Sequence, residues 1–183
     1  MATEPRCKWC NVNNPLYVEY HDHEWCRPNY DDRYLYEMLI LESFQAGLSW
    51  ECVLNKREAF KKAFDGFDIN KVITYDDQKI NSLMENKSII RNRRKIMSAI
   101  KNSVIFKAIA EEYGSFYNYL ETFTHGSTIY ETGRVTNQLS DNISKDLYKR
   151  GMRFVGSVII YSYLQAVGII YSHDEECFLY KDR

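Results

Sequence analysis

The chain has 183 residues, a formal net charge of −1, 45% hydrophobic residues and 15% aromatic residues. This length allows one domain with a substantial core, and the near-neutral charge gives no overall signal for nucleic-acid binding. Five cysteines are an odd number, which argues against a disulfide framework and leaves metal ligation or free thiols. The longest apolar stretches, near 155–170, are interrupted by Ser and Gln, so we expect no transmembrane segment and a soluble, intracellular protein.

Helical periodicity dominates the sequence and strand-like alternation is scarce, so we predict an all-α protein. The first thirty residues are aromatic, turn-rich and crowded with Cys and His, while residues 126–139 resemble a loop with a short extended piece. Asp31 or Asp32 is expected to cap the first helix, Gly47 to end it, and Ser49 to cap the next one. The predicted helices span approximately 31–46, 49–64, 75–85, 92–112, 115–123, 140–150 and 156–167.

The segment ILESFQAGLSW, residues 40–50, places a carboxylate where the helical pattern predicts an apolar residue. Leu35, Met38 and Leu39 form one apolar stripe, and Glu42 continues it. An unpaired buried carboxylate costs several kcal/mol, so burial should raise the pKa of Glu42. The alternative is a structural glutamate that reaches solvent at the edge of the stripe or binds backbone amides.

Side chains that can bind metal gather at both ends of the chain. In the C-terminal HDEEC segment, His173 and Cys177 are four residues apart, a common half-site for tetrahedral zinc. Spacing favours the Cys7-x-x-Cys10 pair for the other half but does not choose between Cys10 and His21. The alternative is a set of surface histidines and small buried thiols. The N-terminal candidates are Cys7, Cys10, His21, His23 and Cys26.

Four ordered segments, YHDHEW, LESFQAGLSW, SKDLYKRGMRFVG and the terminal H-x-x-x-C, resemble the 3-methyladenine DNA glycosylase I family of bacterial alkylation-repair enzymes. The resemblance runs from Cys7 to Cys177. It implies a helix-hairpin-helix glycosylase, with residues 1–183 forming one catalytic domain of two helical lobes and a zinc-bound lobe built from the N- and C-terminal segments. It also implies a monomer in the bacterial cytoplasm that acts on double-stranded DNA containing alkylated bases. The ligands of one structural zinc ion then fall on Cys7, His21, His173 and Cys177, which selects His21 over Cys10.

The resemblance also assigns a role to Glu42. Glu42 and Tyr20 fall on positions that hydrogen-bond the excised base, and Trp50 falls on the position that stacks against it; Trp9 and Trp25 match tryptophans near the pocket. N3-methylated adenine is a cation in DNA and leaves easily, so its enzyme needs base flipping, aromatic faces and a carboxylate more than acid catalysis. Stacking supplies about 1–3 kcal/mol per base, and the carboxylate favours the cation over neutral adenine.

Three places depart from the family pattern. Cys26 follows Trp25 where relatives generally have Gly. The expected hairpin region, MENKSIIRNRRKI at 84–96, lacks a Gly-rich turn, and the loop at 126–139 matches poorly, so it receives no assignment.

Basic residues form two runs despite the near-neutral total charge. The first has no acidic residue between 87 and 101, and the implied activity favours phosphate contact there over a solvated helix face. For the protein as a whole, the alternatives to 3-methyladenine release are a glycosylase with a different lesion range and a zinc-stabilised helical DNA-binding module without activity. The predicted DNA contacts of the first run are Lys87, Arg91, Arg93, Arg94 and Lys95, with Lys101 after them; the second run holds Lys145, Lys149, Arg150 and Arg153.

Overall fold

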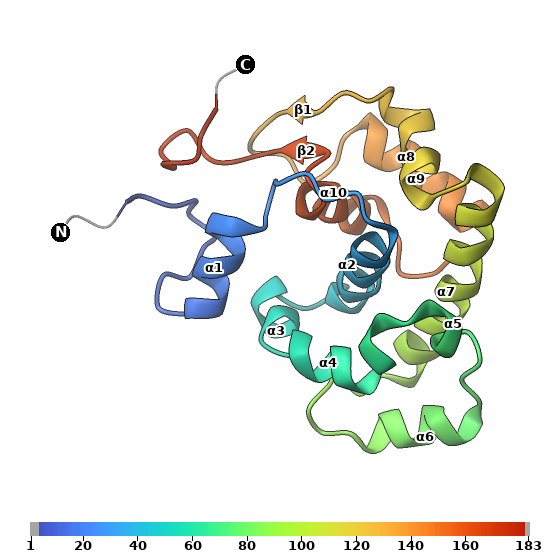
Figure 1. The fold of residues 1–183 in the computed structure, drawn as a ribbon. Coiled ribbons are helices and arrows are strands. Elements are labelled where there is room, and N and C mark those ends of the chain that lie inside the picture. Colours follow the sequence, from blue (N-terminus) through green and yellow to red (C-terminus); the bar gives the residue numbers. More distant parts are fainter. Residues whose placement is uncertain (1–3, 182–183) are drawn as a thin grey trace.

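Helices make up most of the structure, a computed structural model that describes residues 4–181 (Figure 1). The all-α prediction is therefore confirmed, with two short strands and one 3-10 turn, η1, added. Within the described range, no helix combines the length and hydrophobicity that crossing a membrane requires. The elements are α1 Pro15–His23, α2 Asp32–Gln45, α3 Trp50–Leu54, α4 Arg57–Ala63, η1 Asp65–Phe67, α5 Ile69–Val72, α6 Asp77–Glu85, α7 Arg93–Tyr113, α8 Phe116–Thr124, β1 Ile129–Tyr130, α9 Gln138–Lys149, α10 Ser157–Ala166 and β2 Ile170–Tyr171.

Helices α2 and α10 pack against each other at the centre of the molecule (Figure 1). Nearly every side of α2 is buried from Leu35 to Phe44, as expected of a helix that is largely apolar all round. The Asp31 carboxylate accepts hydrogen bonds from two backbone N–H groups and caps the helix, as predicted. The helix ends at Gln45, just before Gly47, whose φ is +77°. A side chain on the inner stripe of α2 is therefore held inside the protein by packing on both sides.

Two predicted elements differ from the structure. The helix expected at 49–64 is divided into α3 and α4 by a turn at Asn55 and Lys56, although Ser49 does cap α3 by accepting a hydrogen bond from Cys52 N. Helix α1 was expected to be a turn-rich region. Its start is marked by the Asn14 side chain, which accepts from Leu16 N, and by Pro15 in the first turn.

The two ends of the described chain lie side by side (Figure 1). Phe178 N donates to Pro5 O at 2.8 Å, and β1 pairs in parallel with β2, with Ile129 opposite Ile170. Gly168, between α10 and β2, has a φ of +79°, and a Cβ there would lie 2.3 Å from Pro28 N. Only glycine allows this close approach between the end of α10 and the segment that follows α1.

A glycine-containing hairpin joins α9 to α10, whereas the sequence predicted the hairpin at residues 84–96. Gly151 has a φ of +103°, and Gly156 precedes the first residue of α10. The turn is fixed to α7, because Asn102 Nδ2 donates to Arg153 O at 2.8 Å and Arg153 N donates to Asn102 Oδ1 at 2.9 Å. The second basic run therefore lies on and around this hairpin.

Candidate functional site

Four side chains that can bind metal meet where the two ends of the chain come together. Cys7, His21, His173 and Cys177 are all buried, and their ligand atoms lie within 4.8 Å of one another. His173 Nδ1 is 3.5 Å from each of the two Sγ atoms, and His21 Nε2 is 3.6 Å from Cys177 Sγ. Tetrahedral zinc with bonds of about 2.0–2.3 Å separates neighbouring ligand atoms by about 3.6 Å. The three shorter separations therefore match those of a tetrahedral metal ion of this size.

The surroundings of the cluster also suit a metal. His21 Nδ1 lies 2.7 Å from Asp22 Oδ1, and Arg6 Nη2 donates to Asp22 Oδ2 at 2.6 Å, so a carboxylate orients the imidazole from behind. A backbone N–H group donates to Cys7 Sγ at 3.3 Å. Burial lowers the pKa of His173 to about 4, so its imidazole is neutral at pH 7, the form that binds metals.

Three further thiols, those of Cys10, Cys26 and Cys52, lie outside this cluster. Spacing alone favoured Cys10 as a ligand, but Cys10 Sγ lies 3.8 Å from Tyr17 O and is not among the four clustered residues. His21 is the fourth member of the cluster because α1 places it next to the C-terminal residues His173 and Cys177. Cys26 adopts a left-handed conformation with a φ of 60°, and its Sγ accepts a hydrogen bond from Ser172 N at 3.3 Å.

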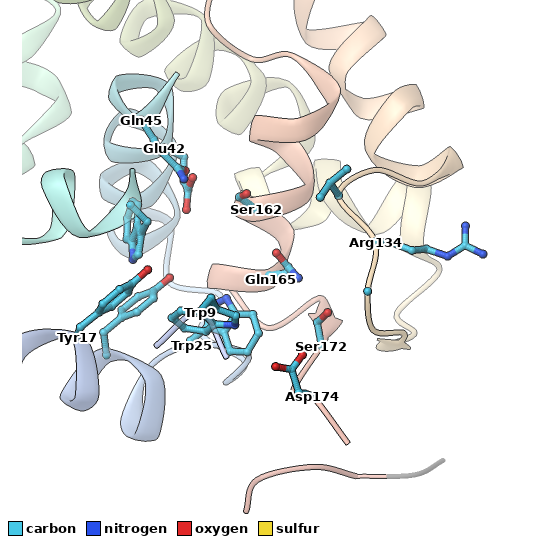
Figure 2. A pocket seen from close by; sticks show the side chains of 14 residues that line it. Trp9, Tyr17, Trp25, Glu42, Gln45, Arg134, Ser162, Gln165, Ser172 and Asp174 are labelled. Carbon is cyan, nitrogen blue, oxygen red and sulfur yellow. The ribbon is translucent and has the colours of Figure 1, made fainter. Parts of the chain in front are cut away.

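A cavity of about 500 Å³ lies beside the cluster and has an aromatic wall (Figure 2). The Trp9 and Trp25 rings meet edge to face at 4.6 Å, and the Tyr20 and Trp50 rings lie 5.3 Å apart. Trp9 is 36% exposed, whereas the Tyr20, Trp25 and Trp50 side chains are buried. The wall is therefore open at Trp9 and closed behind Tyr20. The aromatic residues that line the cavity are Trp9, Tyr17, Tyr20, Trp25 and Trp50.

Helix α2 brings Glu42 and Gln45 to the same cavity (Figure 2). Glu42 is 2% exposed, and burial raises its pKa well above the usual carboxyl range. Among the described residues, no side chain or backbone group hydrogen-bonds to Glu42 Oε2, Gln45 Oε1 or Trp50 Nε1, although all three atoms are buried. Burial, and after it the charge of Glu42, raises the pKa of Tyr20, so the Tyr20 hydroxyl remains a donor at pH 7. Two acceptors and one donor without partners therefore surround an aromatic cavity.

The other side of the cavity comes from the second half of the chain. Ser162 and Gln165 project from α10, and Ser172 and Asp174 follow from the segment around β2 (Figure 2). Residues 133–135 complete the lining. The cavity is thus bounded by α1, α2 and α3 on one side and by α10 and two loop segments on the other.

The described fold and cavity have close counterparts among known proteins. The methyladenine glycosylase family matches residues 9–180. The chain belongs to this family. DNA-3-methyladenine glycosylase 1 of Escherichia coli (strain K12) is 39% identical over an alignment of 183 positions, and the alignment covers 96% of each chain.

Two solved structures agree with this membership. A crystal structure of 3-methyladenine DNA glycosylase I superposes with a TM-score of 0.92 at 37% identity, covering 97% of this chain and all of that one. A single-residue variant of 3-methyladenine DNA glycosylase I in complex with 3-methyladenine has a TM-score of 0.89 at 32% identity, covering 94% of this chain and 96% of that one. Nearly all of the described chain therefore has the fold of this glycosylase family.

Most of the basic run predicted to contact DNA is exposed in this member of the glycosylase family, with one exception. Lys95 is 7% exposed, and its Nζ donates to Phe44 O at 2.8 Å and to Ala46 O at 2.6 Å. The predicted DNA contact at Lys95 is therefore wrong, because this cation caps the carboxyl end of α2. The residues that remain exposed are Lys87, Arg91, Arg93 and Arg94.

The two basic runs meet on the surface of the glycosylase. Arg94 of α7 and Arg153 of the hairpin line one shallow hollow, together with Met97, Tyr148 and Phe154. Among these, Met97 is 51% exposed and Tyr148 42% exposed. One residue from each basic run therefore lines the same hollow, with apolar side chains beside the two cations.

Sequence reasoning missed several residues that line the cavity. Tyr17 precedes Tyr20 by three positions on α1, and Gln45 follows Glu42 by three on α2, so helical spacing from the predicted residues was a usable signal for both. Gln165 and residues 133–135 had no such signal, because tertiary packing alone brings them to α2.

Proposed function

We propose that this protein is a monofunctional DNA glycosylase that hydrolytically releases 3-methyladenine from alkylated DNA. The observation that carries the proposal is the Glu42 carboxyl group, which is buried in an aromatic cavity with Oε2 unpartnered among the described residues. A carboxyl group in this position lowers stability unless a ligand uses it. Membership of the methyladenine glycosylase family and the similarity to a structure in complex with 3-methyladenine support the same substrate.

The cavity suits an extruded cationic base. Methylation at N3 gives the adenine in DNA a positive charge, which weakens the glycosidic bond before any enzyme acts. We infer that Trp50 stacks on the base, that Tyr20 and Glu42 hydrogen-bond to it, and that Trp9 and Trp25 complete the aromatic surroundings. Cleavage leaves the bonding electron pair on the base, which departs neutral, while water adds to the sugar carbon and loses one proton to the solvent. Binding and orientation supply most of what this reaction requires.

Selectivity against normal adenine follows from the position of the Glu42 proton. Burial raises the pKa of Glu42 and disfavours its charged form in the free protein. A cationic base within hydrogen-bonding distance lowers that pKa and favours the carboxylate. Neutral adenine gives no such compensation, so the buried carboxylate discriminates by charge.

The Cys7, His21, His173 and Cys177 cluster is proposed to hold one structural zinc ion. All four positions of a tetrahedral site are filled by protein, so a bound ion would join the chain ends and would have no open position for a substrate. Its contribution to function is to position α1, which carries Tyr17 and Tyr20 as well as His21.

Duplex DNA is proposed to lie across the exposed basic residues and the α9–α10 hairpin. The first turn of α10 has no side-chain cap, so its N–H groups can bind a phosphate, and the surrounding cations add counterion release. We infer that the protein acts as a monomer in the bacterial cytoplasm, where DNA that needs this repair is found. The cations proposed to contact phosphate are Lys87, Arg91, Arg93 and Arg94.

A base-release assay tests the proposed activity. Duplex DNA treated with a methylating agent is incubated with the protein, and released bases are separated by chromatography. We expect 3-methyladenine as the main product, with abasic sites left in an unbroken backbone. Binding to the duplex without release of any base would instead support a zinc-stabilised DNA-binding module, and release of other bases would indicate a different lesion range.

A salt titration tests the proposed DNA surface. The triple alanine variant of Arg91, Arg93 and Arg94 should bind all duplex sequences more weakly and show a flatter dependence of affinity on salt, because phosphate contacts carry no sequence information. Unchanged affinity and salt dependence would assign this stretch to an ordinary solvated helix face.

A further inference from the structure

The loop that carries residues 133–135 forms part of the cavity wall, opposite the α2–α3 segment. Gly133, Arg134 and Val135 line the cavity, whereas none of them contributes to the aromatic wall or the metal cluster. Figure 2 shows the Arg134 guanidinium group directed away from the cavity. The Arg134 side chain therefore lies at the edge of the site and does not face the base.

Both ends of the loop are anchored, so its tip has a defined position. Before the tip, Glu131 N donates to Tyr171 O at 3.1 Å, which continues the β1–β2 pairing. After the tip, Asn137 caps α9 in a reciprocal arrangement with Ser140, and the Asn137 side chain also donates to Glu131 Oε1. This last bond closes the loop on itself and leaves the tip between two fixed points.

The tip exposes one cation and one apolar side chain at the edge of the cavity. The Arg134 side chain is 64% exposed and makes an ion pair of 3.5 Å with Glu131, whose carboxylate is already shared with Asn137. An exposed pair of this kind contributes little to stability. Val135 is 68% exposed, the highest value among the large hydrophobic residues exposed in the described chain. Neither side chain stabilises the loop, so the fold does not require their identity.

The loop also lies next to the helix end where a phosphate is expected. Ser140, in the first turn of α9, has its Oγ 3.0 Å from the Oγ of Ser157, the first residue of α10. This contact places the start of α9, which follows the loop directly, beside the uncapped first turn of α10. The loop thus connects the cavity lining to the helix that touches the proposed phosphate position.

We propose that the tip of this loop grips the backbone of the extruded nucleotide. Arg134 binds a phosphate next to the extruded nucleotide, and Val135 packs against its deoxyribose. The inference rests on the proposed function, because it requires a nucleotide with its base in the cavity. The loop adds a positioning element for that nucleotide, while recognition of the lesion stays with the base cavity.

The test uses a duplex that contains a tetrahydrofuran abasic site, which supplies the extruded sugar and its phosphates without a base. Arg134→Ala should weaken binding of this duplex about tenfold and reduce the slope of log affinity against log salt by about one. Arg134→Lys should recover most of the slope, since it keeps the charge. Lys62→Ala, at an exposed position on α4, is the matched control and should change neither quantity.

Val135→Thr replaces one methyl group by a hydroxyl of similar size. It should weaken binding of the abasic-site duplex about fourfold and leave the salt slope unchanged. Binding of free 3-methyladenine, followed by tryptophan fluorescence, should be equal to that of the parent protein in all these variants. The fluorescence measurement tests the base cavity, and therefore the proposed function, independently of the loop.

Two results would overturn the proposal. Arg134→Ala with parental affinity and parental salt slope would show that no phosphate is bound there. Equal losses in Arg134→Ala and Lys62→Ala would show only a general electrostatic effect. If the parent protein fails to bind free 3-methyladenine while the loop variants still weaken duplex binding, the proposed substrate is wrong and the DNA contact remains.

Discussion

Replacing Glu42 by Gln keeps the shape of the side chain and removes its charge. Glu42 is 2% exposed, and its Oε2 atom has no partner among the described residues. A bound cationic base would therefore be the main group that offsets the cost of burying the carboxylate charge. A hydrogen bond to a charged partner contributes about 1.5–3 kcal/mol, which corresponds to a rate effect of roughly 10- to 150-fold. We therefore expect kcat/KM for 3-methyladenine release to fall within that range, while folding, metal content and duplex affinity are retained.

The assay is single-turnover release of 3-methyladenine from methylated duplex DNA at saturating protein. Glu58→Gln, an exposed position on α4, is the matched control and should release the base at the parental rate. Because the released base is neutral, Glu42→Gln should weaken the binding of free 3-methyladenine less than it slows the release of the base from DNA. A Glu42→Gln variant that excises 3-methyladenine at the parental rate would falsify the assignment and make the carboxyl group structural.

The pH dependence of stability checks the same reasoning without DNA. Burial raises the pKa of Glu42 in the folded protein, so the folded state binds this proton more tightly than the unfolded chain. The resulting stabilisation is fully present below the ordinary carboxyl pKa and is lost as the pH rises through the raised pKa. The free energy of unfolding of the parent protein, relative to Glu42→Gln, should therefore decline over this interval, by up to about 1.4 kcal/mol per pH unit. A difference that stays constant with pH would show that Glu42 is ionised or solvated in the free protein.

Three further changes test other parts of the structure. Elemental analysis should find one zinc ion per chain in the parent protein and in Cys10→Ser, and none in Cys177→Ser; loss of zinc from both variants would place Cys10 in the site. Lys95→Met leaves two carbonyl groups at the end of α2 without their cation, so urea denaturation should show a loss of about 2–3 kcal/mol with an unchanged salt slope for DNA binding. Gly168→Ala would place a methyl group 2.3 Å from Pro28 N and should lower the unfolding free energy by about 3 kcal/mol. Parental stability of this variant would show that the segment at Pro28 can move away from residue 168.

The predictable part of the fold is the part that local periodicity determines. Helix α2 was predicted almost to the residue because its cap and its apolar positions agree, and Glu42 was recognised because it interrupts that pattern. Helix α1 was missed because its buried side chains are mostly tyrosine, histidine and aspartate, which show no apolar stripe. Only contacts distant in sequence explain why those residues are buried.

The site was predictable from the resemblance and less so from spacing. A two-residue separation favoured Cys10 over His21, because spacing describes a local loop and not a ligand delivered by a helix. Lys95 was counted among the DNA contacts because it lies in a run of cations. Its side chain instead extends along the protein to the end of α2, a contact between residues 51 positions apart that no local pattern encodes. The loop at 133–135 reaches the cavity in the same way, through tertiary packing.

Because the chain ends are joined, we expect α1 and the segment around residues 170–178 to open together as one unit. Helix α1 has limited packing against the helical body, its main element contact being α3, while His21 ties it to His173 and Cys177. Loss of metal should therefore raise amide hydrogen exchange in α1 and in residues 170–178 together, leaving α7 and α9 protected. Metal supply would then regulate the base cavity through Tyr17 and Tyr20 without altering the surface proposed to bind DNA.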